Sequence, residues 1–290
     1  MPIIHTVHAD LEYLDDGPLD GRPIVLLHGF PDVAETWDEV LALLPGDCRV
    51  IRPSLRGVGG SRVTNAEARS AQVAALATDV IDLTTALGLD RFVLVGHDWG
   101  ARAAHAVAAL EPHRVTGLVT LSTAYGPGAG LSDSERLDDA AAAWYRYWLC
   151  TASGADEFSR DPAALVRWAW ARWSPGFALP DGALDAILTA TDTDQFAEDV
   201  VHYYRHGAGE ATGSPVYDRA QRVLDAWPAI DVPATFLIGT DDGCETLAPA
   251  RGNAALFARG RDLVELPGAG HFLTRERPRD VAGAIARHLG

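Results

Sequence analysis

The sequence predicts an α/β fold, a mostly parallel sheet with helices on both faces, that carries an inserted all-helical lid. Three observations predict it. Short apolar runs of strand length alternate with segments of helical spacing early and late in the chain. A turn with glycine on both sides joins a buried strand to a helix at residues 91–102. Between residues 126 and 217 no strand-like run occurs, and helix starts and stops follow one another.

Length and charge limit the classes of protein to consider. A chain of 290 residues suits one large domain or a domain with an insertion. We expect residues 1–125 to form the first part of the core, 126–217 the helical lid and 218–290 the second part. The formal charge of −16 argues against nucleic acid and against an anionic membrane surface as partners.

The cysteines and the hydropathy of the sequence indicate where in the cell the protein is expected. The three cysteines are far apart and no CxxC pair occurs, so neither a disulfide framework nor a zinc site is indicated. The start of the chain lacks the pattern of a signal peptide, and no apolar run is long enough to cross a bilayer. We expect a cytoplasmic protein that needs no metal or organic cofactor, and a homodimer is left open.

The first third of the chain predicts an edge hairpin and two buried strands. Residues 1–13 alternate loosely, as in a hairpin at the edge of a sheet. The apolar run 23–27 predicts a strand that ends at a glycine, where the backbone can approach a ligand at the edge of the sheet. The run 48–51 predicts a further strand, followed by a glycine-rich loop at 52–61. That loop lacks the spacing of a phosphate-binding loop.

The next elements alternate as an α/β sheet requires. Apolar residues recur at helical spacing over 73–87, and Gly88 provides a stop. The strand 92–95, a helix to about residue 110 and the strand 115–121 follow.

The rhythm changes after residue 125. Ser132 and Glu135 have the spacing of a capping box at a helix start. We expect the helices of this stretch to pack over the site as a lid, and most of its tryptophans to belong to ordinary core. Five of the eight tryptophans lie here: Trp144, Trp148, Trp168, Trp170 and Trp173.

The last third returns to the α/β pattern. Residues 234–238 and 262–266 predict two more strands, each followed by a glycine-containing turn. A final helix is expected to begin at Pro278, because proline is favoured in the first turn of a helix.

The chemistry is indicated by the turn after the strand 92–95. Gly96 and Gly100 stand two residues before and after Asp98, the spacing of a nucleophile elbow. A carboxylate is a poor nucleophile towards an ester or an amide. It can displace an activated leaving group at an sp3 carbon and form an alkyl ester, which a base must then help water to hydrolyse. The alternative, an acidic N-cap of the helix, leaves the two glycines unexplained.

Three polar residues follow the ends of three predicted strands in the order Asp98, Asp242 and His271. This is the chain order of nucleophile, acid and histidine in the hydrolase triad. His271 would act as the base, and Asp242 would hold its other ring nitrogen. Asp241 is the competing acid, and a histidine that serves only the core is the alternative for His271.

Backbone amides are expected to stabilise an oxyanion at this site. The candidates are the N–H of Trp99, directly after the nucleophile, and that of Phe30, after the strand 23–27.

Four other histidines invite functional roles. His28 and His97 are expected to hold loops. His202 and His206 have an i, i+4 spacing that could hold a metal, but no HExxH motif or third ligand accompanies them.

These motifs resemble those of the epoxide hydrolases of the α/β-hydrolase superfamily over nearly the full chain. They are HGFP at 28–31, LRGxGxS at 55–61, GHDWG at 96–100 and GxGHF at 268–272. The resemblance implies an α/β-hydrolase core with a lid inserted after the sixth core strand. It also implies an activity, the opening of a small apolar epoxide to a vicinal diol.

In this family two lid tyrosines hold the epoxide oxygen. The matching residues are Tyr145 in Trp-Tyr-Arg-Tyr and Tyr204 in Tyr-Tyr-Arg, with the adjacent Tyr147 and Tyr203 as alternatives. A phenol, with a pKa near 10, stays protonated at neutral pH and can donate to a developing alkoxide. The expected substrate pocket is formed by three aromatic residues: Phe30, Trp99 and Trp144.

The chain departs from the family pattern at Ser54, where aspartate is frequent, and after Cys150, where a proline-containing loop is frequent. Haloalkane dehalogenases share the aspartate nucleophile, with a halide held by the residue that Trp99 matches and by a second N–H donor. That donor is often an asparagine at the position of Phe30, and a lid tryptophan could replace it. Fluoroacetate dehalogenases usually have arginine in place of Trp99. A ligand-binding protein with a retained hydrolase fold is a further alternative.

Overall fold

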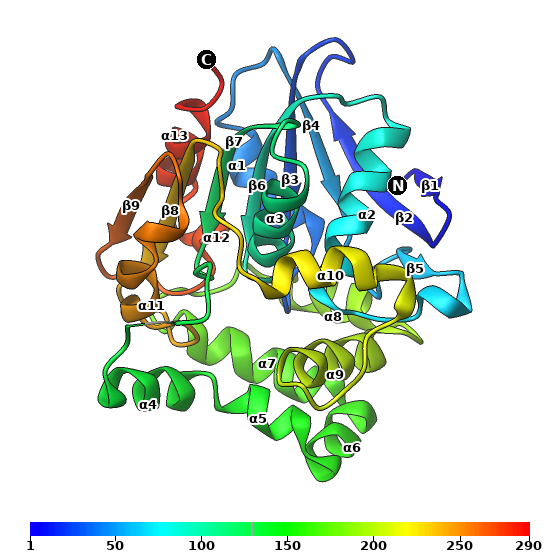
Figure 1. Cartoon of the computed structure of the whole chain (residues 1–290), viewed down its shortest axis with the longest axis vertical. Helices are drawn as coiled ribbons and strands as arrows, with labels where there is room; N and C mark the ends of the chain where they lie inside the picture. Colours follow the sequence, from blue (N-terminus) through cyan, green and yellow to red (C-terminus); the bar gives the residue numbers. More distant parts are fainter. Residues whose placement is uncertain (129) are drawn as a thin grey trace.

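The computed structural model describes residues 1–128 and 130–290, and a nine-stranded sheet runs through its centre (Figure 1). The strand order is β1-β2-β4-β3-β6-β7-β8-β9, with β5 paired to β2. The strands are β1 (Ile3–His5), β2 (Ala9–Asp16), β3 (Arg22–Leu27), β4 (Cys48–Pro53), β5 (Arg62–Val63), β6 (Phe92–His97), β7 (Val115–Leu121), β8 (Ala234–Gly239) and β9 (Arg261–Leu266).

The sheet is antiparallel at one edge and parallel elsewhere. β1, β4 and β5 each pair with β2 in the antiparallel sense, and all pairs from β4 to β9 are parallel. The predicted fold class, the edge hairpin and every predicted strand are confirmed. The two-residue β5 was not predicted because it is too short to show a period. It makes the strand 115–121 the seventh in the numbering, although it is the sixth of the predicted strands. The helical insertion follows this strand, as expected, and β5 lies off the main path of the sheet.

Parallel strands in this sheet are buried on both faces, which explains their continuous apolar runs. All six residues of β6 are buried. Phe92 and Leu94 belong to one hydrophobic cluster, whereas Val93 and Val95 belong to the cluster on the opposite face. A period of two divides the run between two cores.

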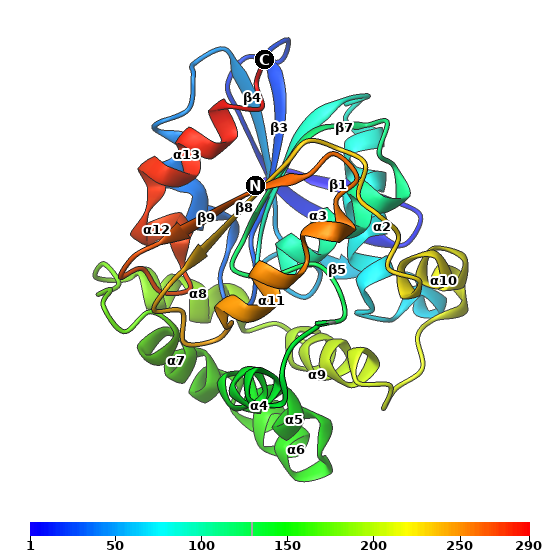
Figure 2. The ribbon, with the colours of Figure 1, turned by 60° about the vertical axis from the view of Figure 1, so that its left-hand side comes forward.

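Helices cover both faces of the sheet (Figures 1 and 2). One face is covered by α2 (Val73–Ala86), α3 (Trp99–Leu110) and α10 (Asp218–Asp225), which contact one another. On the other face α1 (Asp38–Leu41) packs against α12 (Leu273–Glu276) and α13 (Pro278–Ala286). The short α11 (Leu247–Gly252) lies on the α3 face, where its Ala250 packs against Phe236 and Ile238 of β8. The final helix begins at Pro278, as predicted.

Between β7 and β8 the described residues contain helices and no strand. Apart from α10, which packs on α2 and α3, these helices lie together at one end of the sheet (Figure 1). The predicted capping box is present, with Ser132 and Glu135 bonded reciprocally. The boundaries at 126 and 217 stay a prediction. Besides α10, the helices are α4 (Asp133–Ala142), α5 (Trp144–Cys150), α6 (Ala152–Arg160), α7 (Pro162–Trp173), α8 (Ala183–Thr191) and α9 (Phe196–Gly207).

The glycine-rich loop after β4 is fixed by an internal ion pair. Its Arg56 is buried and donates from Nε and Nη2 to the two carboxylate oxygens of Asp79 on α2, at 2.8 and 2.7 Å. The same guanidinium donates to the Ala75 carbonyl at 3.1 Å. These contacts give the loop a structural role.

In the described part of the chain no helix is long and apolar enough to cross a membrane.

The close packing of α3 against β3 makes Gly100 a sensitive position. A Cβ there would overlap the carbonyl oxygens of Leu27 and His28, which belong to the backbone and cannot rotate away. We expect Gly100→Ala to lower the free energy of unfolding by about 1–3 kcal/mol, the usual effect of overpacking. Denaturant unfolding followed by circular dichroism measures it. Gly46→Ala is the control, because a Cβ at Gly46 meets nothing within 4 Å. Equal stability of the two variants would contradict the account.

Candidate active site

The turn between β6 and α3 has the strained geometry of a nucleophile elbow. Asp98 adopts a φ of 51°, in the region that residues with a Cβ rarely occupy. A Cβ at Gly96 would overlap the backbone of Gly100, so both glycines are required for this turn. The Asp98 side chain is only 4% exposed, and the N–H of Phe30 donates to its Oδ1 at 2.8 Å.

Of the two predicted oxyanion donors, Phe30 therefore points at the Asp98 carboxylate. The N–H of Trp99 is the first amide of α3. Among the described residues it forms no hydrogen bond to Asp98, so its part in an oxyanion hole stays a prediction.

His271 lies between the two carboxylates. Its Nδ1 is 2.9 Å from Oδ2 of Asp242, and its Nε2 is 3.8 Å from Oδ2 of Asp98. The Asp242 carboxylate also accepts from the N–H groups of Cys244 and Glu245, at 2.8 and 2.9 Å. These amides fix the carboxylate, which can in turn fix the imidazole.

Between the two candidate acids, the structure places Asp242 beside His271. The side chain of Asp242 is fully buried. Asp241 is exposed, and its carboxylate accepts from the Thr240 hydroxyl at 3.0 Å.

The loop that carries His271 is tied to the end of α7. The N–H of His271 donates to the carbonyl of Trp173 and to Oγ of Ser174, at 3.0 and 2.9 Å. Its carbonyl accepts from Nε2 of His97 at 2.9 Å and from Oγ of Ser122 at 2.7 Å. The backbone on both sides of the imidazole is therefore fixed.

Burial and charge act in opposite directions on the histidines. For His271, burial opposes the charged imidazolium, but the charge and hydrogen bond of Asp242 outweigh it and raise the pKa above its usual value. For His97, burial and the neighbouring charge of His271 lower the pKa to about 4. His28 is also buried, which lowers its pKa, and its Nε2 accepts from the Leu55 N–H at 2.9 Å. His28 and His97 hold loops, as expected.

Two tyrosines of the helical insertion meet above Asp98. Tyr145 comes from α5 and Tyr204 from α9, and their hydroxyl oxygens are 3.3 Å apart. Nε1 of Trp99 donates to the Tyr204 hydroxyl at 3.1 Å. Burial raises the pKa of both phenols well above the usual value, so both are protonated at neutral pH.

The adjacent tyrosines lie differently. The ring of Tyr203 stacks on Trp99, with 3.9 Å between the ring centroids, and Tyr147 is 62% exposed. The structure therefore brings together the tyrosine pair that the motifs indicated.

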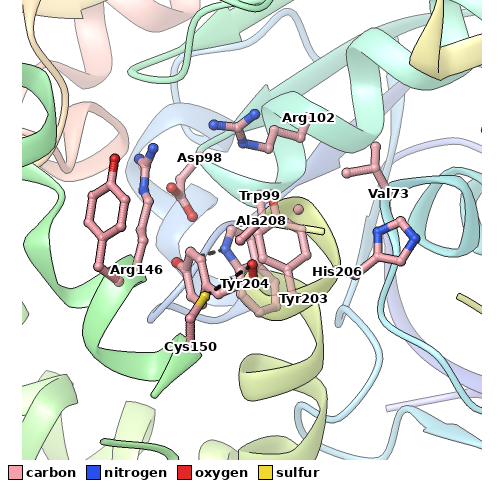
Figure 3. A pocket seen from close by; sticks show the side chains of 12 residues that line it. Val73, Asp98, Trp99, Arg102, Arg146, Cys150, Tyr203, Tyr204, His206 and Ala208 are labelled. Atoms are coloured by element: carbon pink, nitrogen blue, oxygen red, sulfur yellow. Dashed lines mark hydrogen bonds between the residues drawn. The ribbon is translucent and has the colours of Figure 1, made fainter. Parts of the chain in front are cut away.

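A cavity of about 270 Å³ opens beside Asp98 (Figure 3). Trp99, Tyr203 and Tyr204 line it, together with Cys150. Tyr145 and His271 are fully buried and contact groups that face this cavity.

The expectation that Trp144 lines the substrate pocket is wrong. Trp144 is 41% exposed and packs against Trp148 and Trp168, away from the cavity. The two-turn helix α5 buries one face, which carries Tyr145, and the adjacent Trp144 therefore points to another side of the helix. Trp173 lies near the site instead, with ring centroids 5.0 Å from Tyr145 and 5.1 Å from His271. The sequence held no signal that separated Trp173 from its neighbours.

Phe30 was also expected to line the substrate pocket, but it is not among the described residues that line this cavity. Its ring stacks on Trp99, with ring centroids 5.5 Å apart, and borders a separate small cavity. Arg102 and Arg146, which the sequence analysis did not single out, line the cavity beside Asp98. Arg146 forms an ion pair with the buried Glu245. A signal existed for both, because Arg102 stands one helical turn after Asp98 and Arg146 directly follows Tyr145.

No group of His, Cys, Asp and Glu side chains that could hold a metal ion occurs in residues 1–128 and 130–290. In the pair considered as metal ligands, both ring nitrogens of His202 are already in hydrogen bonds. One faces the Ala71 N–H and the other the Thr212 carbonyl, each at 3.1 Å.

Comparison with known proteins places this geometry in a family. The profile described as alpha/beta hydrolase fold matches residues 22–278. The chain belongs to the α/β-hydrolase family. A crystal structure of a candidate epoxide hydrolase from Klebsiella pneumoniae superposes with a TM-score of 0.91 and 30% identity, over 99% of this chain and 96% of that chain.

Curated relatives agree with the resemblance seen in the motifs. Epoxide hydrolase A of Mycobacterium tuberculosis is 29% identical over 93% of this chain and 91% of its own length. A fluoroacetate dehalogenase of Burkholderia is 35% identical over 44% of this chain and 42% of its own length. The resemblance of this α/β-hydrolase to epoxide hydrolases is confirmed.

The position of Asp242 predicts a measurable pKa. We expect Asp242→Asn to lower the pKa of His271, because burial then acts without the opposing carboxylate. Histidine carbon-13 NMR titration of the wild type and the variant measures the pKa. Asp241→Asn is the matched control and is expected to leave the titration unchanged. If Asp241→Asn caused the larger shift, the assignment of the acid would be reversed.

Proposed function

We propose that this α/β-hydrolase is an epoxide hydrolase that opens an epoxide to a vicinal diol through an ester on Asp98. The observation that carries the proposal is the pair of buried, protonated tyrosine hydroxyls that meet above an aspartate nucleophile. A nucleophilic carboxylate and a pair of acidic donors suit a substrate whose leaving oxygen stays attached to the carbon chain.

The first step is ring opening. One oxygen of Asp98 attacks an epoxide carbon and forms a C–O bond, while the C–O bond of the ring breaks. The oxygen of the ring takes the electron pair of that bond, accepts hydrogen bonds from the hydroxyls of Tyr145 and Tyr204, and takes one proton from one of them, which becomes a tyrosinate. The Phe30 amide holds the other carboxylate oxygen and orients the nucleophile. The product is a hydroxyalkyl ester of Asp98.

The second step is hydrolysis of the ester. His271 takes a proton from a water, which attacks the carbonyl carbon of the ester. Asp242 stabilises the imidazolium and fixes the tautomer in which Nε2 accepts the proton. The oxyanion is stabilised by the Phe30 amide and by that of Trp99. Its collapse breaks the bond between the Asp98 carbonyl carbon and the oxygen of the alkyl group. That oxygen takes the proton of the newly added hydroxyl, which releases the diol and restores the carboxylate. The imidazolium gives its proton back to the tyrosinate formed in the first step.

Dehalogenation of a haloalkane is the second candidate, because it uses the same nucleophile and one relative is a fluoroacetate dehalogenase. The site offers less to a halide. The indole N–H of Trp99 is engaged with the Tyr204 hydroxyl, and Phe30 has no side-chain N–H. A ligand-binding role without turnover is the third candidate, and the complete set of Asp98, His271 and Asp242 argues against it.

Trapping the ester distinguishes the three candidates. We expect His271→Gln to form the ester without hydrolysing it, because the base is lost and the nucleophile remains. Intact-protein mass spectrometry after incubation with epoxides should show the mass of the whole epoxide, on the peptide that contains Asp98. A haloalkane that adds only its alkyl group would favour the dehalogenase. The double variant with Asp98→Ala is the control and should gain no mass. Absence of any adduct in His271→Gln would contradict a covalent mechanism.

The tyrosines are tested in the first step alone. In the His271→Gln background, Tyr145→Phe and Tyr204→Phe should each slow ester formation, and the double change by about 10²-fold or more, the usual contribution of a general acid. Stopped-flow or quenched mass spectrometry gives the rate. Tyr13→Phe on β2 is the control. Unchanged rates in both single variants would remove the tyrosines from the mechanism.

A further inference from the structure

Arg102 lines the cavity and has no part in the proposed mechanism. It lies on α3, one turn after Asp98, and its side chain reaches the cavity beside the nucleophile. Figure 3 shows the guanidinium groups of Arg102 and Arg146 flanking the Asp98 carboxylate. Within the described chain the side chain of Arg102 donates no hydrogen bond and forms no ion pair, and the residue is partly buried.

Three other arginines with mostly buried side chains are paired with carboxylates. Arg56 has both oxygens of Asp79, Arg146 has Glu245, and Arg52 has Asp16 at 2.8 Å. The guanidinium nitrogens of Arg102 are not among the buried side-chain atoms that lack a partner, so they are accessible from the cavity and can bind a ligand there. Arg102 thus differs from the arginines that stabilise the fold.

The charges around Arg102 leave its donors available. Asp98 and Glu245 are the nearby carboxylates, Arg146 is the nearby cation and the Tyr203 phenol is neutral. Glu245 is already paired with Arg146, and one oxygen of Asp98 accepts from the Phe30 amide. Neither carboxylate lies within ion-pair distance of Arg102.

Arg102 also separates two cavities. A second cavity of about 310 Å³ lies beyond it and shares Val73, Arg102, His206 and Gly207 with the first. His105, which lines this second cavity, has its pKa lowered to about 3 by burial and is neutral. Asp225 lies on its exposed side. Arg102 is therefore the cationic group at the junction, between the nucleophile and the outer cavity.

We propose that Arg102 binds a carboxylate carried by the substrate, so that the enzyme acts on small epoxides with an anionic group close to the ring. The inference rests on the proposed function. A guanidinium can bind a carboxylate through two parallel N–H···O bonds, which fix its position as well as its charge. With the carboxylate at Arg102 and the ring oxygen at Tyr204, a ring carbon faces Asp98. This replaces the expectation of a purely apolar substrate.

The charge balance of the reaction agrees with this role. A carboxylate next to the Asp98 carboxylate would be repelled, and the cation of Arg102 offsets that repulsion. Arg102 touches the substrate and takes no part in bond breaking. Its effect is expected on the choice between charged and neutral substrates.

Binding of unreactive analogues tests the site without turnover. Cyclopropanecarboxylate and cyclopropanecarboxamide have a three-membered carbon ring and differ in charge. Calorimetric titration of the wild type should show the carboxylate binding about 10- to 100-fold more tightly than the amide, as a charged hydrogen bond provides. Arg102→Met should abolish the preference, and Arg102→Lys should keep part of it. Arg91→Met, which removes an exposed charge, is the control and should keep the preference.

Turnover of a matched pair of epoxides gives the second measurement. We expect the ratio of kcat/KM for oxirane-2-carboxylate over its amide to be about 10 or more in the wild type. The ratio should fall to near 1 in Arg102→Met and stay intermediate in Arg102→Lys. If Arg102 only held the fold or Asp98 in place, both substrates would be slowed equally and the ratio would be kept.

The outcomes separate this inference from the proposed function. Epoxides that label Asp98 in His271→Gln with no preference for the carboxylate would overturn the role of Arg102 and leave the function standing. A preference for cyclopropanecarboxylate that depends on Arg102, without any epoxide adduct, would support the anion site and overturn the epoxide hydrolase. The preference of the wild type for the carboxylate over the amide is measured without any variant. The inference can therefore be contradicted even if Arg102→Met does not fold.

Discussion

The contact of α3 with the end of β3 is the constraint on which the site depends. Gly100 has no room for a Cβ because the start of α3 packs directly on the backbone at the end of β3. This packing holds Asp98, the residue before α3, at its strained φ of 51°. The same contact brings the segment after β3 to the nucleophile, so that the Phe30 amide meets the carboxylate at 2.8 Å. A looser junction would relax the turn and move donor and nucleophile apart together. Strain of this kind persists because surrounding packing over-determines it.

Parallel sheet topology supplies the remaining groups. The strands β3, β6 and β8 end at the same edge, and β9 leads there to His271 through a short turn. Residues more than a hundred positions apart therefore meet without long loops. The helical insertion closes the site from the opposite side with two phenols, which the low dielectric of their surroundings keeps protonated. The two phenols come from the helical insertion, and Asp98, Asp242 and His271 come from turns at the edge of the sheet.

The sequence sufficed where a local rule is strong and failed where side-chain direction depends on packing between helices. Buried parallel strands are continuous apolar runs, so their positions were predicted closely. The glycines around Asp98 report a backbone conformation and were equally informative. Trp144 and Trp173 are chemically alike, and only the packing of α5 and α7 decides which one approaches the site. The spacing of Arg102, one helical turn after Asp98, places it near the site, but only the three-dimensional packing shows that its side chain reaches the cavity without a carboxylate partner.

The attachment of the His271 loop to Trp173 and Ser174 limits which helices of the insertion can move without displacing His271. Those hydrogen bonds join the end of α7 to the base itself. A rigid-body movement of all the helices of the insertion would displace the His271 backbone. It would move the imidazole away from Asp242 in each turnover. Movement confined to α9 and the segment after it would leave the base undisturbed. That end carries His206 and Gly207, which border both cavities. We therefore expect α7 to stay in place during turnover and α9 to move. The diol is expected to leave beside α9.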